Sequence, residues 1–184
     1  MELLNPSLKK FEKLNVLSKP GNAVLFGSTF ASTLPVSELS QDYGISQIVY
    51  NRSINGLSVF DAKDYIKTCV IDLAPQKIFI ALGEEDLDKE ISEVIAQYEW
   101  LLYQIHSKLK DCRIYLVSVC SKNRNTTAIN DAIQKLAVES GCNYVSISDA
   151  FLNDMPELKA FNIIKTYLRD YPINFTEAMM LQSS

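Results

Sequence analysis

Five short apolar runs alternate with helical stretches along this chain, and this alternation restricts the fold more than any other feature. The runs are too short for core helices and end at glycines or polar loops, which is typical of buried strands. Strands alternating with helices at this spacing predict parallel βαβ units with right-handed connections. We therefore expect an α/β fold, a three-layer α/β/α sandwich with a five-stranded parallel sheet of flavodoxin-like order 2-1-3-4-5. The expected strands cover residues 22–26, 45–50, 77–82, 113–119 and 143–147.

The apolar residues of the intervening stretches recur at helical spacing, most clearly over residues 91–109. A helix is also expected to start at Ser58, because Ser58-x-x-Asp61 resembles a capping box. The length of 184 residues suits a single domain over 1–184, with residues 1–20 as an N-terminal helical extension. The other expected helices cover residues 3–16, 35–44, 129–137, 156–168 and 175–181.

Charge and composition exclude several classes of function. The net charge of −4 and the pI of about 5.1 do not suit a nucleic-acid-binding surface. No apolar run approaches the ~20 residues of a membrane span, and residues 1–19 lack the apolar centre of a secretory signal. The four cysteines form no C-x-x-C pair and mostly lie in apolar runs, so we expect reduced core residues in a cytoplasmic protein. We expect no cofactor and no metal.

The first strand ends at Gly27, and two hydroxyl residues, Ser28 and Thr29, follow it. The carboxyl ends of the strands in an open parallel sheet are where such folds place their ligand sites. A polar strand-to-helix turn with a capping hydroxyl is the alternative interpretation. The loops 51–56 and 83–86, and the later segment 170–176, are expected to converge on the same edge.

Four segments carry a resemblance to a known family. They read Phe-Gly-Ser-Thr at 26–29, Asn-Arg-Ser-Ile-Asn-Gly at 51–56, Gly-Glu-Glu-Asp at 83–86 and Asp-Tyr-Pro-Ile-Asn at 170–174. Their order and spacing resemble the SGNH or GDSL hydrolases, a family of esterases and acyl hydrolases. The resemblance extends over about residues 22–178.

The resemblance implies a role for each position, and this chain departs from the family at four of them. Thr29 stands where the family has its nucleophilic serine. Ser53 replaces a glycine whose N–H binds the oxyanion, and Glu85 replaces the asparagine that is the other oxyanion donor. Asn174 stands about where the family has its catalytic histidine, in a block that begins at Asp170. An asparagine cannot take a proton from a nucleophile, and an ionised glutamate only accepts hydrogen bonds.

The sequence therefore predicts a protein with altered catalytic positions that binds a small carbohydrate or acyl compound without ordinary ester hydrolysis. Asn51, Ser53, Gly56 and Glu85 are its expected binding residues. One alternative is an active esterase that uses Thr29 or Ser28 with a different base. The other alternative is a structural partner in a complex.

The single histidine, His106, is an unpromising replacement base, because it lies inside the long helix of residues 91–109. The acidic loop that contains Glu84, Glu85, Asp86 and Asp88 has three interpretations. It could be a solvated first helical turn, a site for a cationic or hydroxyl-rich ligand, or a site for a hard metal ion.

Overall fold

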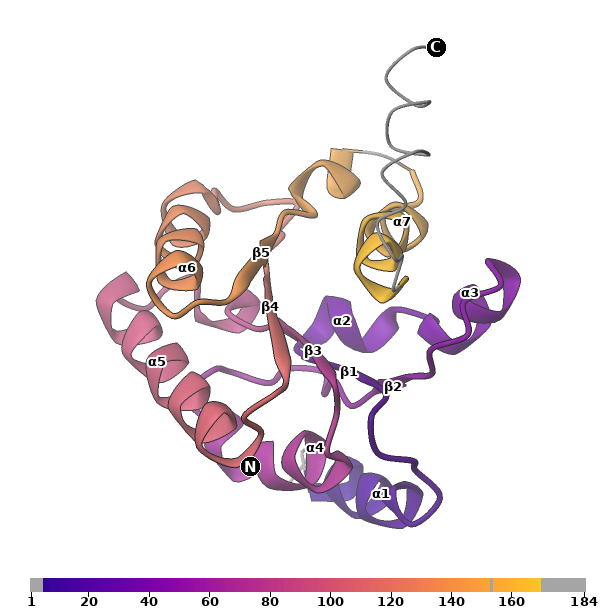
Figure 1. Ribbon diagram of the computed structural model, residues 1–184. Helices are drawn as coiled ribbons and strands as arrows, with labels where there is room; N and C mark the ends of the chain where they lie inside the picture. Colours follow the sequence, from indigo (N-terminus) through magenta and orange to yellow (C-terminus); the bar gives the residue numbers. More distant parts are fainter. Residues whose placement is uncertain (1–4, 153, 170–184) are drawn as a thin grey trace, which may run out of the picture.

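A computed structural model describes residues 5–152 and 154–169 of the chain and contains one five-stranded parallel sheet between two layers of helices (Figure 1). The strand order is β2-β1-β3-β4-β5, which confirms the order expected from the sequence. The strands are β1 (Ala23–Gly27), β2 (Val49–Asn51), β3 (Lys77–Ala81), β4 (Arg113–Val117) and β5 (Asn143–Val145).

The two faces of the sheet carry separate apolar cores. On one face, α4, α5 and α6 pack with Val24, Phe26 and Ile78, and α1 packs outside α4. On the other face, α2, α3 and α7 pack with Leu25 and Phe79. The helices are α1 (Asn5–Asn15), α2 (Thr29–Thr33), α3 (Val36–Asp42), α4 (Ile66–Cys69), α5 (Ile91–Lys108), α6 (Thr127–Glu139) and α7 (Pro156–Leu168).

Gly27 lets the end of β1 lie against β3 and α2. A Cβ atom placed at this position would be 2.5 Å from the carbonyl oxygen of Ala81 and 2.6 Å from the Cβ of Ala31. Both distances are shorter than any relaxed contact, so only glycine fits without a backbone shift. The glycine thereby brings the residues that follow β1 close to the loop that follows β3.

The expected helices over 91–109 and 156–168 are confirmed as α5 and α7. The prediction of one continuous helix from Ser58 is wrong, because this segment consists of three short pieces. The Ser58 hydroxyl donates to the Asp86 carboxylate instead of capping a helix, and Ala74 has a left-handed backbone with φ of 41°. The three pieces are η1 (Ala62–Asp64), α4 and η2 (Ile71–Leu73). The expected helix over 175–181 lies outside the described residues.

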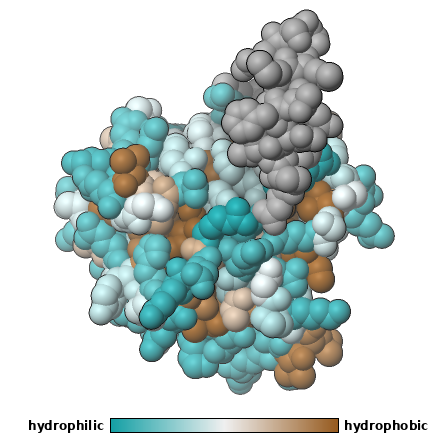
Figure 2. Space-filling model, in the orientation of Figure 1, coloured by the Kyte–Doolittle hydropathy of each residue, from teal (hydrophilic) through white to brown (hydrophobic). Residues whose placement is uncertain are grey.

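The surface and the thiols complete the description. Within the described ranges, no helix is both long and apolar enough to cross a membrane. Figure 2 shows a largely hydrophilic face with separate apolar areas, and Val16 and Leu17, just after α1, are 84% and 80% exposed. Burial raises the pKa of the Cys69 and Cys120 thiols to about 12, so these cysteines are poor nucleophiles at neutral pH.

Candidate functional site

Three loops meet at the carboxyl end of β1. Ser28 follows the strand directly, is fully buried, and donates its backbone N–H to the carbonyl oxygen of Ala81 at 2.9 Å. Thr29 is the first residue of α2 and is half-buried. The turn at Gly27 therefore places two hydroxyl groups at the edge of the sheet, as the sequence predicted.

The Thr29 hydroxyl is hydrogen-bonded on both sides. It donates to Oε1 of Glu85 over 2.5 Å, and it accepts the backbone N–H of Gly56 over 3.0 Å. The Ser28 hydroxyl donates to the same Glu85 oxygen over 3.2 Å. Glu85 and Gly56 are exposed, so this cluster of Ser28, Thr29, Gly56 and Glu85, here called the edge cluster, lies at the protein surface.

The side chains of Asn51 and Ser53 form hydrogen bonds inside the protein. The Asn51 side chain donates to the carbonyl oxygens of Ala31 and Leu34 at 2.9 and 3.2 Å, and its Oδ1 accepts the Ser53 N–H at 3.0 Å. The Ser53 hydroxyl donates to the carbonyl oxygen of Leu25 at 3.3 Å, and the residue is buried. The Ser53 N–H, which the resemblance assigns to an oxyanion, is therefore already bonded to Asn51.

The acidic loop holds three carboxylates with different partners. Glu84 accepts the backbone N–H of Phe30 at 2.9 Å, while Asp86 accepts the N–H of Val59 at 2.9 Å and the hydroxyl of Ser58. Asp86 is only 1% exposed, so it is not part of a solvated helical turn. The loop forms η3 (Glu84–Asp86), and α5 begins later, at Ile91.

Burial shifts the titration of two of these acids. Desolvation raises the pKa of the Glu84 carboxyl, partly offset by the hydrogen bond from Phe30. Desolvation also raises the pKa of Asp86, partly offset by the hydrogen bonds from Ser58 and Val59. Among the described residues, no three His, Cys, Asp or Glu side chains are arranged to hold a metal ion.

In the described part of the chain, the Thr29 hydroxyl donates to Glu85, so this carboxylate is placed to take its proton. His106 is exposed on α5, and its Nε2 lies 3.9 Å from the Cys142 sulfur. Cys142 directly precedes β5, so His106 lies at the amino edge of the sheet, opposite Thr29. Asp170 and Asn174 lie outside the described residues.

One small cavity lies beside the acidic loop. A cavity of about 20 Å³ opens next to Glu84, with Phe30, Ser118 and Cys120 also in its wall. This volume holds about one water molecule, so it does not accommodate an acyl chain.

The sequence did not predict the hydrogen bond from the Ser58 hydroxyl to Asp86. The two residues are separated by 28 positions, and the capping-box pattern at Ser58 suggested a local role instead. The available signal was that Asp86 follows an apolar strand and is not needed to start a helix. No comparable signal in the sequence indicated that the Ser53 N–H donates to Asn51.

Comparisons with known proteins agree on the architecture. No protein-family model matches the sequence, and no curated protein matches it closely enough to count as a relative. A structure described as a platelet activating factor from Streptococcus pneumonia superimposes with a TM-score of 0.80 at 19% identity, covering 91% of this chain and 94% of that one. A structure described as that of an acylhydrolase from Bacteroides fragilis gives a TM-score of 0.70 at 12% identity, covering 88% of this chain and 95% of that one.

A third structure, the acetylxylan esterase Axe2 from Geobacillus stearothermophilus, gives a TM-score of 0.59 at 18% identity, covering 75% of this chain and 83% of that one. Because all of these identities are below 25%, the likeness concerns the fold. The chain has the SGNH/GDSL hydrolase fold.

Proposed function

We propose that this chain binds a small hydroxyl-rich or acyl compound at the edge cluster and does not catalyse ordinary ester hydrolysis. The observation that carries the proposal is the hydrogen bond from Thr29 to Glu85. By the family resemblance, this carboxylate stands where an acyl hydrolase has a hydrogen-bond donor for a developing negative charge.

The charge balance of hydrolysis supports this proposal. A tetrahedral oxyanion is stabilised by donors, and removing one of them typically costs ~10²–10³ in rate. Here the Ser53 N–H is bonded to Asn51, and an ionised Glu85 would repel the oxyanion. Thr29 therefore lies next to a negative charge, which disfavours the oxyanion that forms in acyl transfer.

The same arrangement suits a neutral or cationic ligand. Glu85 is exposed and its carboxylate accepts hydrogen bonds, so it can receive the hydroxyl groups of a sugar or an ammonium group. Two of the structural neighbours are described as an acetylxylan esterase and an acylhydrolase. A carbohydrate or an acylated small molecule is therefore the ligand class that we propose.

A second candidate function rests on the same contact between Thr29 and Glu85. A carboxylate within 2.5 Å of a hydroxyl is within reach to act as its general base. In that case Glu85 takes the proton as Thr29 Oγ1 attacks the acyl carbon. The alcohol then leaves with a proton, and water hydrolyses the acyl-threonine. Of the groups bonded to Thr29 in the described structure, Gly56 offers the one N–H donor.

One experiment separates the two candidates. Purified protein is incubated with short p-nitrophenyl esters and with a fluorophosphonate probe, beside Thr29→Ala and beside Thr33→Ala as an exposed control in the same helix. Binding without catalysis predicts no turnover above background and no labelling in any of the three proteins. Turnover and stoichiometric labelling that disappear only in Thr29→Ala would establish the esterase and overturn the proposal.

A further inference from the structure

A second hollow lies on the β5 side of the sheet, between α6 and α7 where β5 ends. Its volume is about 600 Å³, and α6 and α7 flank β5 in Figure 1. Ligand pockets for small molecules have volumes of about 300–1,000 Å³. This groove, here called the β5 groove, is therefore large enough for a mono- or disaccharide.

The chemistry of its wall is almost entirely uncharged and polar. Among the described residues that line the hollow, hydroxyl and amide side chains dominate, Asp131 is the one acid, and there is no lysine or arginine. A phosphate or carboxylate ligand would meet a carboxylate without a compensating cation, which is unfavourable. The wall therefore disfavours anionic ligands and suits ligands that donate and accept hydrogen bonds.

Several of these groups have unused hydrogen-bonding capacity. In the described ranges, the side chains of Asp131 and Gln134 make no hydrogen bond or ion pair with another residue, and both lie on the exposed side of α6. Asn130 differs, because its amide accepts the backbone N–H of Val119 at 2.7 Å and donates to the carbonyl oxygen of Val119 at 2.9 Å. The free groups thus lie toward the solvent side and the fixed amide lies at the base.

Two tyrosines add aromatic surface to this polar wall. Tyr144 comes from β5 and Tyr167 from α7, so they approach the groove from different layers, and both are partly buried. A sugar combines hydroxyl groups with C–H faces, and such faces pack on aromatic rings while the hydroxyls bond to carboxylate and amide groups.

We infer that the β5 groove is a binding site for a neutral mono- or disaccharide. Asp131 and Gln134 bond to the sugar hydroxyls, and Tyr144 and Tyr167 contact its apolar faces. This site goes beyond the proposed function, because it shares no residue with the edge cluster. Ser146 and Ser148 follow β5 and also line the groove, so both sites are on the carboxyl edge of the sheet.

Isothermal titration calorimetry with xylobiose, cellobiose and lactose tests the inference, with glucose 6-phosphate and glucuronate as anionic counterparts. We expect binding of at least one neutral sugar in the millimolar range or tighter and none of the two anions. The double variant Asp131→Ala/Gln134→Ala should weaken binding about tenfold or more, because it loses the hydrogen bonds of both side chains to the sugar. Glu139→Ala removes an exposed acid of the same helix outside the groove and should leave the affinity unchanged.

The outcomes keep this inference separate from the proposed function. Sugar binding that survives Glu85→Gln but is lost in the α6 double variant supports the β5 groove. Sugar binding that is lost in Glu85→Gln and kept in the double variant would overturn the groove and support the edge cluster alone. Absence of binding by all three neutral sugars, or stronger binding of the anions, would also overturn it.

Discussion

Thr29 and Glu85 are 56 positions apart in the sequence, yet their side-chain oxygens are 2.5 Å from each other. The contact joins the end of β1 to the loop that follows β3, two strands that are neighbours in the sheet. We propose that this acceptor, which attracts hydrogen-bond donors, takes the place of a donor that would stabilise negative charge. On this proposal the fold is kept while the polarity of its edge is reversed.

The first prediction concerns the ligand preference set by this reversal. The parent protein should gain thermal stability with hydroxyl-rich or cationic compounds and not with carboxylates or phosphates. Glu85→Gln removes the negative charge but keeps the shape, so it should lose the discrimination against anions. A thermal-shift screen of sugars, polyamines and organic acids measures both proteins.

Asp88→Asn is the matched control for that screen, because Asp88 is an exposed acid of the same loop. It should behave like the parent. Tight carboxylate binding by the parent that does not change in Glu85→Gln would mean that Glu85 does not control the site.

The second prediction concerns pH and Glu84. Burial raises the pKa of this carboxyl above its ordinary value of 4.5, so the folded state binds the proton more tightly than the unfolded state. The stabilisation is fully present below pH 4.5 and is lost as the pH rises through the higher folded pKa. Glu84→Gln has no proton to lose, and its Oε1 can still accept the Phe30 N–H. The variant should therefore show a flatter dependence of the urea midpoint on pH from about 4.5 upward.

Glu99→Gln, an exposed change on α5, is the control for this series and should keep the pH dependence of the parent. Equal slopes for Glu84→Gln and the parent would show that Glu84 is not desolvated in solution. The buried Asp86 shifts in the same direction and remains in both proteins, so some dependence will persist.

The third prediction concerns the close approach at Gly27. In Gly27→Ala the new Cβ would meet the Ala81 carbonyl oxygen at 2.5 Å, and overpacking of this kind costs about 1–3 kcal/mol or more. Gly141→Ala is the comparison, because its Cβ would meet no atom within 4 Å although its φ is +67°. Its cost should be only the ~1–2 kcal/mol of a residue with a Cβ in the left-handed region. Chemical denaturation should rank Gly27→Ala as the more destabilised variant, and the reverse ranking would contradict the observed packing.

The sequence predicted the elements whose signal is local. The apolar spacing over residues 91–109 and 156–168 gave the long helices, and the alternation of runs gave the sheet order. Ser58 shows where local patterns fail, because its capping-box neighbour is three positions away while its actual partner, Asp86, is 28 positions away. The convergence of Thr29 with Glu85 was predicted from the order of the loops, but its hydrogen bonds were not. Such pairings depend on which side chains two loops direct at each other, and no single segment of sequence encodes that.

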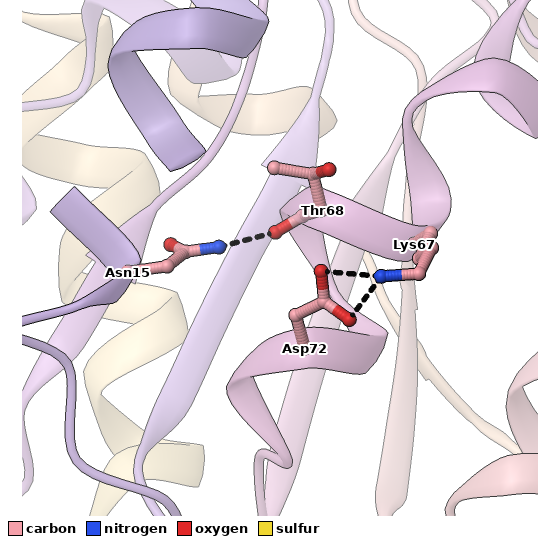
Figure 3. Close-up of polar contacts among 4 residues, drawn as sticks. All are labelled: Asn15, Lys67, Thr68 and Asp72. Atoms are coloured by element: carbon pink, nitrogen blue, oxygen red, sulfur yellow. Dashed lines mark hydrogen bonds and ion pairs between the residues drawn. The ribbon is translucent and has the colours of Figure 1, made fainter. Parts of the chain in front are cut away.

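The fourth prediction concerns Asn15, which holds the end of α1 to the body of the protein. Its Nδ2 donates to the carbonyl oxygen of Thr68 at 2.7 Å (Figure 3), and its Oδ1 accepts Nε of Arg52 at 3.1 Å. Arg52 is only 5% exposed, so Asn15→Ala would leave a buried donor unpaired. The expected cost is about 1–3 kcal/mol, with faster hydrogen exchange in α1 than in α5.

The ion pair between Lys67 and Asp72 is the matched control, since it is drawn in the same view and lies 2.8 Å apart (Figure 3). The Lys67 side chain is 77% exposed, and exposed pairs of this kind contribute about 0–1 kcal/mol. Lys67→Ala should therefore leave both the unfolding midpoint and the exchange of α1 nearly unchanged. If Lys67→Ala destabilised the protein as much as Asn15→Ala, the two contacts would have the same weight. The buried hydrogen bond from Arg52 to Asn15 would then not be the main contact that holds α1 in place. Packing of the apolar residue Phe11, which is 7% exposed, would hold the helix instead.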